Sequence, residues 1–139
     1  MDQGIESVSG YKEIAHTADW ALKVWSVDLP GLFREAATGM YALMGLQFGE
    51  QLPNLHHLEL TANDLESLLV EFLSELLYYV EEGVAFPGIQ VALDGLNLDA
   101  SMKSSAIIER AKEIKAVTFH NLRIQRGENH CETIIVFDV

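Results

Sequence analysis

Carboxylates near both ends of the sequence could hold a divalent metal ion. Asp19 closes the segment His16-Thr17-Ala18-Asp19, which lies between two predicted strands, and Asp138 follows the apolar run 134–137. If residue 139 is the native end of the chain, the α-carboxylate of Val139 adds a second anionic group beside Asp138. Hard cations such as Ca²⁺ prefer oxygen ligands of this type. The spacing does not connect Asp19 with Asp138, and a turn-capping role for Asp19 is the alternative.

Two further side chains suit chemistry that involves charge or proton transfer. His16 could serve as a base or a metal ligand, because imidazole changes its charge near neutral pH, and the alternative is a structural histidine at a strand end. Lys115 is a cation within the strand-like segment 113–120, and the alternative is a solvent-facing strand residue. Both residues remain candidates for a functional site.

Other polar groups are better explained by structure. His56 and His57 are neighbours in a predicted strand, so their side chains point to opposite faces and do not easily share one metal. Cys131 is the single cysteine, and a cysteine at a strand edge usually serves as a small apolar residue. The sequence contains neither a phosphate-binding loop nor a GxSxG nucleophile motif. These patterns define no self-sufficient active site.

Two amphipathic helices are predicted to position these residues. Asp28 is a suitable N-cap for the first helix, whose apolar residues recur at helical spacing until Gly45. Asn63 and Glu66 form a capping box at the start of the second helix, which carries a long apolar stripe and ends at Gly83. Each helix therefore has one apolar face that another layer must cover.

The remaining elements are predicted strands. They cover residues 11–15, 21–27, 55–60, 84–86, 89–93, 96–100, 113–120 and 134–137, with a hairpin turn at 125–129 and a loop at 46–54. The run 134–137 is typical of a strand covered on both faces. Because strands and helices do not alternate, the predicted fold class is α+β, with two main helices packed on a mostly antiparallel sheet. We expect residues 1–10 to form a flexible tail and residues 11–139 a single domain.

Composition narrows the range of functions. The 139 residues include 9 basic and 21 acidic side chains, which gives a formal net charge of −12. This charge argues against direct nucleic-acid binding, which depends on Lys and Arg, and it permits docking onto a basic protein surface. The sequence has no apolar run of the roughly 18 residues that span a membrane. Its acidic N-terminus is unlike a signal peptide, and we expect a cytoplasmic protein.

Three motifs in this order resemble the archease family. They are His16-Thr17-Ala18-Asp19, the segment Glu113-Ile114-Lys115-Ala116-Val117-Thr118-Phe119-His120, and the terminal pair Asp138-Val139. The Leu-rich segment 68–77 between them also looks like the corresponding segment of that family. The resemblance covers about residues 11–139. It implies a small fold with an inserted strand-helix-strand-strand module.

The resemblance also implies a function. Archeases are accessory proteins of the RtcB-type RNA ligase, so the chain would promote guanylylation and multiple turnover of that ligase in tRNA splicing and RNA repair, without being an enzyme itself. The implied metal site falls on Asp19, Asp138 and Val139, with Ca²⁺ as the expected ion and Mg²⁺ or Mn²⁺ as alternatives. Lys115 is implicated in activation, and His16 lies either around the metal site or in a structural role. The link to tRNA would be indirect, through the ligase.

Two other functions from different classes compete with this one. A stand-alone metal-dependent phosphoesterase would turn over phosphate esters with Mn²⁺ or Mg²⁺ and no partner. A general chaperone-like binding module would act on unrelated clients and would not depend on Asp19.

Overall fold

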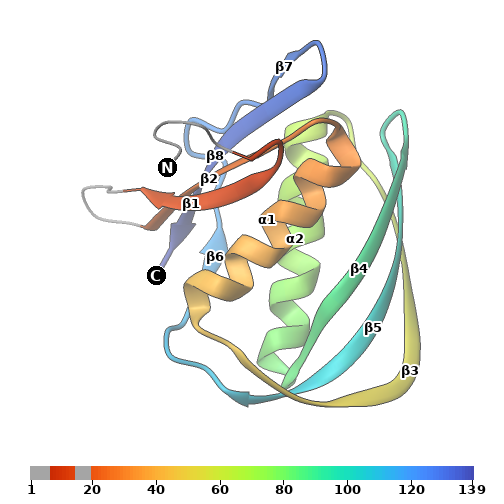
Figure 1. Ribbon diagram of the computed structural model, residues 1–139, viewed down its shortest axis with the longest axis vertical. Helices are drawn as coiled ribbons and strands as arrows, with labels where there is room; N and C mark the ends of the chain where they lie inside the picture. The colour runs from red at the N-terminus through yellow and green to blue at the C-terminus, as the bar shows by residue number, and fades with distance from the viewer. Residues whose placement is uncertain (1–6, 15–19) are drawn as a thin grey trace.

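The computed structural model describes residues 7–14 and 20–139, whose helices and strands form three layers (Figure 1). Two helices lie between two sheets: α1 contacts β2 of the first sheet and β4 of the second, and α2 contacts β6 and β4. The elements are β1 (Gly10–Ile14), β2 (Trp20–Ser26), α1 (Leu29–Met44), β3 (Gln47–Thr61), α2 (Leu65–Glu81), β4 (Val84–Asp94), β5 (Asn97–Glu109), β6 (Ala116–Val117), β7 (Gln125–Gly127) and β8 (His130–Asp138). The predicted α+β class, with antiparallel strand pairing, is confirmed.

The first sheet has the order β1-β2-β8-β6, and β7 also pairs with β8. Strand β8 is therefore an interior strand, and Ile135, Val136 and Phe137 are buried. Ile134 is 44% exposed, so the prediction that the run 134–137 is covered on both faces is wrong at its first residue. The predicted antiparallel pairing of segment 113–120 with the terminal strand is present as the β6–β8 pair. The predicted turn at 125–129 is wrong in its first three residues, because Gln125–Gly127 form strand β7, which pairs with β8, and the chain turns at Asn129 in a positive-φ conformation.

The second sheet has the order β3-β5-β4, and its strands are longer than the sequence predicts. The predicted loop at 46–54 belongs largely to β3, and the predicted break at Pro87 and Gly88 is a register shift inside β4. Both strands are sheet edges, where proline and bulges are tolerated because one side of the strand makes no ladder bonds. The order β3-α2-β4-β5 is the expected strand-helix-strand-strand module.

The start of α1 matches its prediction, whereas the start of α2 does not. The Asp28 side chain accepts a hydrogen bond from the Gly31 nitrogen, and Gly45 ends α1 in a left-handed conformation. The N-cap of α2 is Asp64, whose carboxylate accepts from the Ser67 nitrogen at 2.7 Å. The predicted capping box of Asn63 with Glu66 is therefore wrong.

The side chain of Glu66 makes a long-range contact instead. Its carboxylate accepts a hydrogen bond from the main-chain nitrogen of Ile124 at 2.9 Å, which ties α2 to the segment between β6 and β7. This contact satisfies a backbone donor outside the ladders of the sheets. Glu66 therefore positions the segment that leads back towards β8.

The core fills the space between the helices and the sheets. Phe33 of α1 and Phe72 of α2 are fully buried, with ring centroids 5.8 Å apart. The buried hydroxyl of Tyr41 accepts a hydrogen bond from the Phe86 nitrogen at 3.2 Å and so links α1 to β4; burial raises the pKa of this hydroxyl. In the described residues, neither helix is long and apolar enough to cross a membrane. Part of the predicted tail is described, and there the Ser7 carbonyl accepts a hydrogen bond from the Trp25 indole.

Candidate functional site

Two of the residues singled out from the sequence meet at one edge of the first sheet. The main-chain nitrogen of Lys115 donates a hydrogen bond to the carbonyl oxygen of Asp138 at 2.7 Å. In the adjoining ladder, Ala116 pairs with Asp138 and Val117 with Phe137. The predicted strand 113–120 is thus only two residues long, but its pairing with the terminal strand brings the Lys and the Asp together.

The opposite neighbour of β8 is β2, which begins beside the same site. Trp20 pairs with Phe137, and the ammonium group of Lys112 lies 4.7 Å from the centroid of the Trp20 ring. Asp19 precedes Trp20 in the sequence, but Asp19 and His16 lie outside the described residues. The described part of the site therefore consists of the end of β8, the segment around Lys115 and the start of β2.

The candidate side chains at this edge are exposed to solvent. Lys115 and Asp138 are both exposed, and Val139 is 36% exposed. A groove with a volume of about 430 Å³ runs between α2 and the segment before β6, and Lys115 lines it together with Tyr78 and Glu113. Tyr78 is 60% exposed. The edge thus presents a cation, a carboxylate and an aromatic ring to solvent.

Asp138 contributes one exposed carboxylate to the predicted metal site. The side-chain carboxylate of Asp138 is exposed to solvent, and the hydrogen bond from Lys115 is made to the main-chain carbonyl oxygen. Carboxylate oxygens match the preference of Ca²⁺, Mg²⁺ and Mn²⁺. The described residues supply only part of the predicted metal site, because Asp19 lies outside them, and the site stays a prediction.

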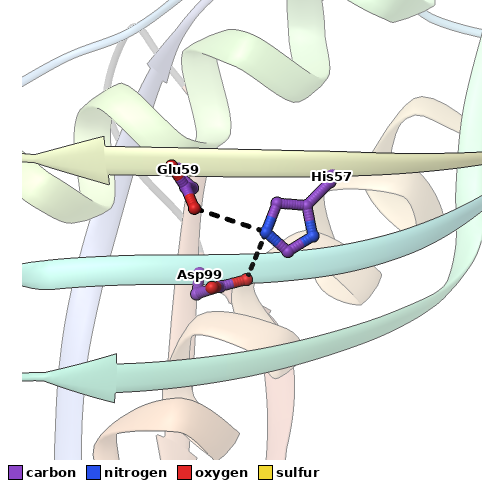
Figure 2. Close-up of side chains that lie close together, drawn as sticks. All are labelled: His57, Glu59 and Asp99. Carbon is purple, nitrogen blue, oxygen red and sulfur yellow. Dashed lines mark ion pairs between the residues drawn. The ribbon is translucent and has the colours of Figure 1, made fainter.

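A second group of polar side chains lies on the outer face of the other sheet (Figure 2). His57 and Glu59 belong to β3, and Asp99 belongs to the neighbouring strand β5. The Nε2 atom of His57 lies 2.9 Å from Oδ1 of Asp99 and 3.6 Å from Oε2 of Glu59. Within residues 7–14 and 20–139, this is the one group of three metal-ligating side chains whose donor atoms all lie within 4.8 Å of one another.

Local sequence patterns did not predict this cluster, because they bear only on whether His56 and His57 could share one metal. The inference that His56 and His57 face opposite sides of the strand is correct, because the His56 ring packs against Phe86 and His57 faces outward. One partner of His57 is Glu59, two residues further along β3, and the other is Asp99 of β5. The spacing His57-x-Glu59 was the available signal, but Asp99 joins them only through the register of β3 with β5.

Cys131 is a structural residue. Its side chain is 3% exposed, and its thiol lies 3.6 Å from the carbonyl oxygen of Ser26. Burial raises the thiol pKa, the negative charge of Asp28 raises it further, and Arg126 lowers it. A thiol held in its neutral form inside a sheet is a poor nucleophile, so the interpretation of Cys131 as a small apolar residue agrees with its surroundings.

The architecture defines a small α+β protein in which two helices lie between a five-stranded sheet and a three-stranded sheet. The model of the Archease protein family (MTH1598/TM1083) matches residues 11–139. The chain belongs to this family.

Individual relatives agree with this assignment, and two solved structures share the fold. Protein archease of Methanosarcina acetivorans is 31% identical over 142 residues, which cover 93% of this chain and 95% of the relative. Protein archease of Methanothermobacter thermautotrophicus is 29% identical over 140 residues, covering 95% of this chain and 100% of the relative. A Thermotoga maritima protein described as an archease and possible chaperone has the same fold, with a TM-score of 0.70 and 22% identity over 92% of this chain and 96% of that one. Protein 1598 of Methanobacterium thermoautotrophicum gives a TM-score of 0.69 at 24% identity, with coverages of 94% and 99%.

Proposed function

We propose that this protein is a non-catalytic accessory protein that promotes guanylylation, and hence multiple turnover, of an RtcB-type RNA ligase. Membership of the archease family supports the proposal. The observation that carries it is the hydrogen bond between Lys115 and Asp138, because it unites the two motifs that the resemblance connects with activation and metal binding.

The residues proposed to hold the metal are Asp19 and Asp138, together with the α-carboxylate of Val139 where residue 139 ends the chain. A bound divalent cation would supply positive charge beside the triphosphate of a nucleotide or the phosphoryl group being transferred. Lys115 adds a fixed positive charge on the same edge, and its exposed position leaves it accessible to a large partner. The protein's part in this scheme is to present these groups at the border of the ligase pocket.

The charge of the protein favours a protein partner over RNA. A net charge of −12 repels phosphate backbones and complements a basic surface such as the one a ligase presents to its RNA. The link to tRNA in this proposal is therefore indirect. Association through complementary charges weakens with added salt, because surface charges are screened over about 10 Å at 0.1 M ionic strength.

Ligase guanylylation tests the proposal directly. The ligase is held at limiting concentration with GTP and a divalent metal, and formation of the guanylylated enzyme is followed with and without this protein. We expect stimulation by the wild-type protein and little or none by Asp138→Asn or Asp19→Ala. Lys115→Gln should also reduce stimulation, because it removes the charge and keeps much of the side-chain length.

Matched controls come from the other sheet. Lys103 and Asp94 are exposed strand residues of β5 and β4, so Lys103→Gln and Asp94→Asn make the same chemical changes away from the proposed site. Both controls should stimulate like wild type. Equal loss with the controls would mean that general surface charge is responsible, and a folded wild-type protein that gives no stimulation of its cognate ligase would rule out the accessory role. Hydrolysis of phosphate esters by the pure protein would instead support the phosphoesterase alternative.

A further inference from the structure

We propose that His57, Glu59 and Asp99 form a separate binding site for a divalent transition-metal ion of the Zn²⁺ class. The site lies on the outer face of the β3-β5-β4 sheet, whereas Asp138 lies in the other sheet. It therefore does not rest on the proposed ligase function. Its donor set is also different, because it contains an imidazole nitrogen, which suits Zn²⁺, Ni²⁺ or Cu²⁺ better than Ca²⁺ or Mg²⁺.

The sheet register places two carboxylates opposite each other. Glu59 of β3 pairs directly with Asp99 of β5. Like charges at directly opposite positions destabilise a pair of strands, so this arrangement is costly without a positive charge between them. Asp94 of β4 lines the same hollow as Glu59 and Asp99, which makes the surface more negative. The position favours a bound cation on electrostatic grounds.

The imidazole is placed to complete a three-ligand set. His57 lies two residues before Glu59 in β3, and residues two apart in a strand share one face. Two ligands of one tetrahedral Zn²⁺ ion, each about 2.0–2.1 Å from it, lie roughly 3–3.5 Å from each other. The distances of 2.9 and 3.6 Å from the His57 nitrogen to the two carboxylates are close to this spacing.

The side chains can adjust to an ion. Those of His57, Glu59 and Asp99 are 53%, 75% and 52% exposed, so neighbouring side chains leave them room to rotate, and their donor atoms already lie within 4.8 Å of one another. Three protein ligands on a solvent-facing sheet leave a fourth position for water or for a ligand from a partner. The structure thus assigns an open site, able to accept a further donor.

The competing explanation is a simple ion pair between a protonated imidazole and its carboxylates. The chain provides a matched control for it, because Nε2 of His130 lies 2.8 Å from a carboxylate oxygen of Glu132 and both residues are partly exposed. That pair has one imidazole and one carboxylate, one ligand fewer than the β3–β5 cluster. If an exposed His-carboxylate pair were enough to bind the ion, His130 would bind it as well.

Titration with Zn²⁺ distinguishes the two explanations. The full chain is stripped with a chelator and titrated with Zn²⁺ by isothermal titration calorimetry, with Ca²⁺ as a second probe. Changing outer-shell partners of a metal already costs about 10–100-fold in affinity, so loss of a ligand in His57→Ala or Asp99→Asn should weaken Zn²⁺ binding at least tenfold. His130→Ala should bind Zn²⁺ like wild type, and Ca²⁺ should not compete at this site.

Two further measurements keep the proposal testable. Asp138→Asn should retain the Zn²⁺ site, which separates it from the proposed ligase-activating edge. Circular dichroism confirms that each variant is folded, and Glu59→Gln provides a third variant if one of the others unfolds. Wild-type protein without Zn²⁺ binding, unchanged binding in folded His57→Ala, or equal loss in His130→Ala would each overturn the proposal.

Discussion

The main-chain nitrogen of Lys115 and the carbonyl oxygen of Asp138 are 2.7 Å apart, and the hydrogen bond between them involves neither side chain. The backbone therefore holds the edge of the first sheet together, and both side chains are left exposed to solvent. Side-chain chemistry at this edge can change without changing the geometry that presents it.

This separation predicts that Lys115→Gln and Asp138→Asn leave the fold intact. Surface substitutions outside special features change stability by about 0.5 kcal/mol or less, so each variant should melt close to wild type. Thermal denaturation followed by circular dichroism measures the effect. A fall in stability of more than about 2 kcal/mol would show that these side chains hold the strand ends, in which case loss of ligase stimulation would no longer report on function.

Two neighbouring isoleucines of β8 provide a test of the layered core. Ile135 is fully buried, whereas Ile134 is 44% exposed on the other face of the same strand. We expect Ile135→Ala to lower the free energy of unfolding by about 2–5 kcal/mol, through lost burial and the cavity left behind, and Ile134→Ala by clearly less. Urea denaturation of both variants gives the comparison. Similar losses would mean that the Ile134 side chain is also covered in solution.

The start of α2 has a pH-dependent stabilising contact. The hydrogen bond from the Ser67 nitrogen is the main cause that lowers the pKa of Asp64 from its ordinary value of 3.8. A carboxyl with a lowered folded-state pKa stabilises the protein above pH 3.8 and loses this effect as the pH falls through the folded-state value. The melting temperature of Asp64→Ala should therefore lie below that of wild type at neutral pH, and the gap should narrow below pH 3.8.

The matched variant for this measurement is Asn63→Ala, which changes the adjacent exposed residue. Because Asp64 is the N-cap, Asn63→Ala should have little effect at any pH. If Asn63→Ala lowered the melting temperature more than Asp64→Ala, Asn63 would be the N-cap, as the predicted capping box requires.

Cys131 should be protected from alkylation in the native protein. Burial raises its thiol pKa and closes access, and alkylation requires the exposed thiolate. Iodoacetamide at pH 8 should modify the folded protein on the order of a hundredfold more slowly than the urea-unfolded protein, since reaction needs local opening. Mass spectrometry follows the modification. Equal rates in the two states would place the thiol at the surface.

The helices show how far local sequence signals reach. Asp28 and Gly45 mark both ends of α1 as predicted, because a capping carboxylate and a left-handed glycine act within one turn of the chain. The wrong N-cap at α2 arises because local signals do not distinguish two adjacent capping residues. Asn63 and Asp64 are adjacent, and both residue types suit an N-cap. The Glu66 carboxylate accepts a hydrogen bond from the Ile124 nitrogen, a partner that is distant in sequence, and so does not cap the helix.

The sheets and the sites depend on contacts that local patterns do not contain. The prolines and glycines of β3 and β4 predict interruptions of these strands. Both strands continue through them with register shifts, which edge strands tolerate. The pairing that joins Lys115 to Asp138 follows from two predicted strands with a turn between them, and this edge could therefore be predicted from the sequence. The cluster of His57, Glu59 and Asp99 was not, since the register of β3 on β5 decides which residues stand opposite.

Strand β8 pairs with β2 across a long stretch of the chain, and this separation affects the order of folding. Cys131 stands opposite Ser26, 105 residues away in sequence, whereas β3, α2, β4 and β5 form one contiguous segment. Closing a long loop costs more entropy than forming a hairpin, so distant pairings form late. The contiguous segment can thus assemble while β2 still lacks its partner. The edge that carries Lys115 and Asp138 joins β6 to β8, which lie much closer in sequence, so only the side of the proposed site that β2 supplies through Trp20 has to wait for the distant pairing.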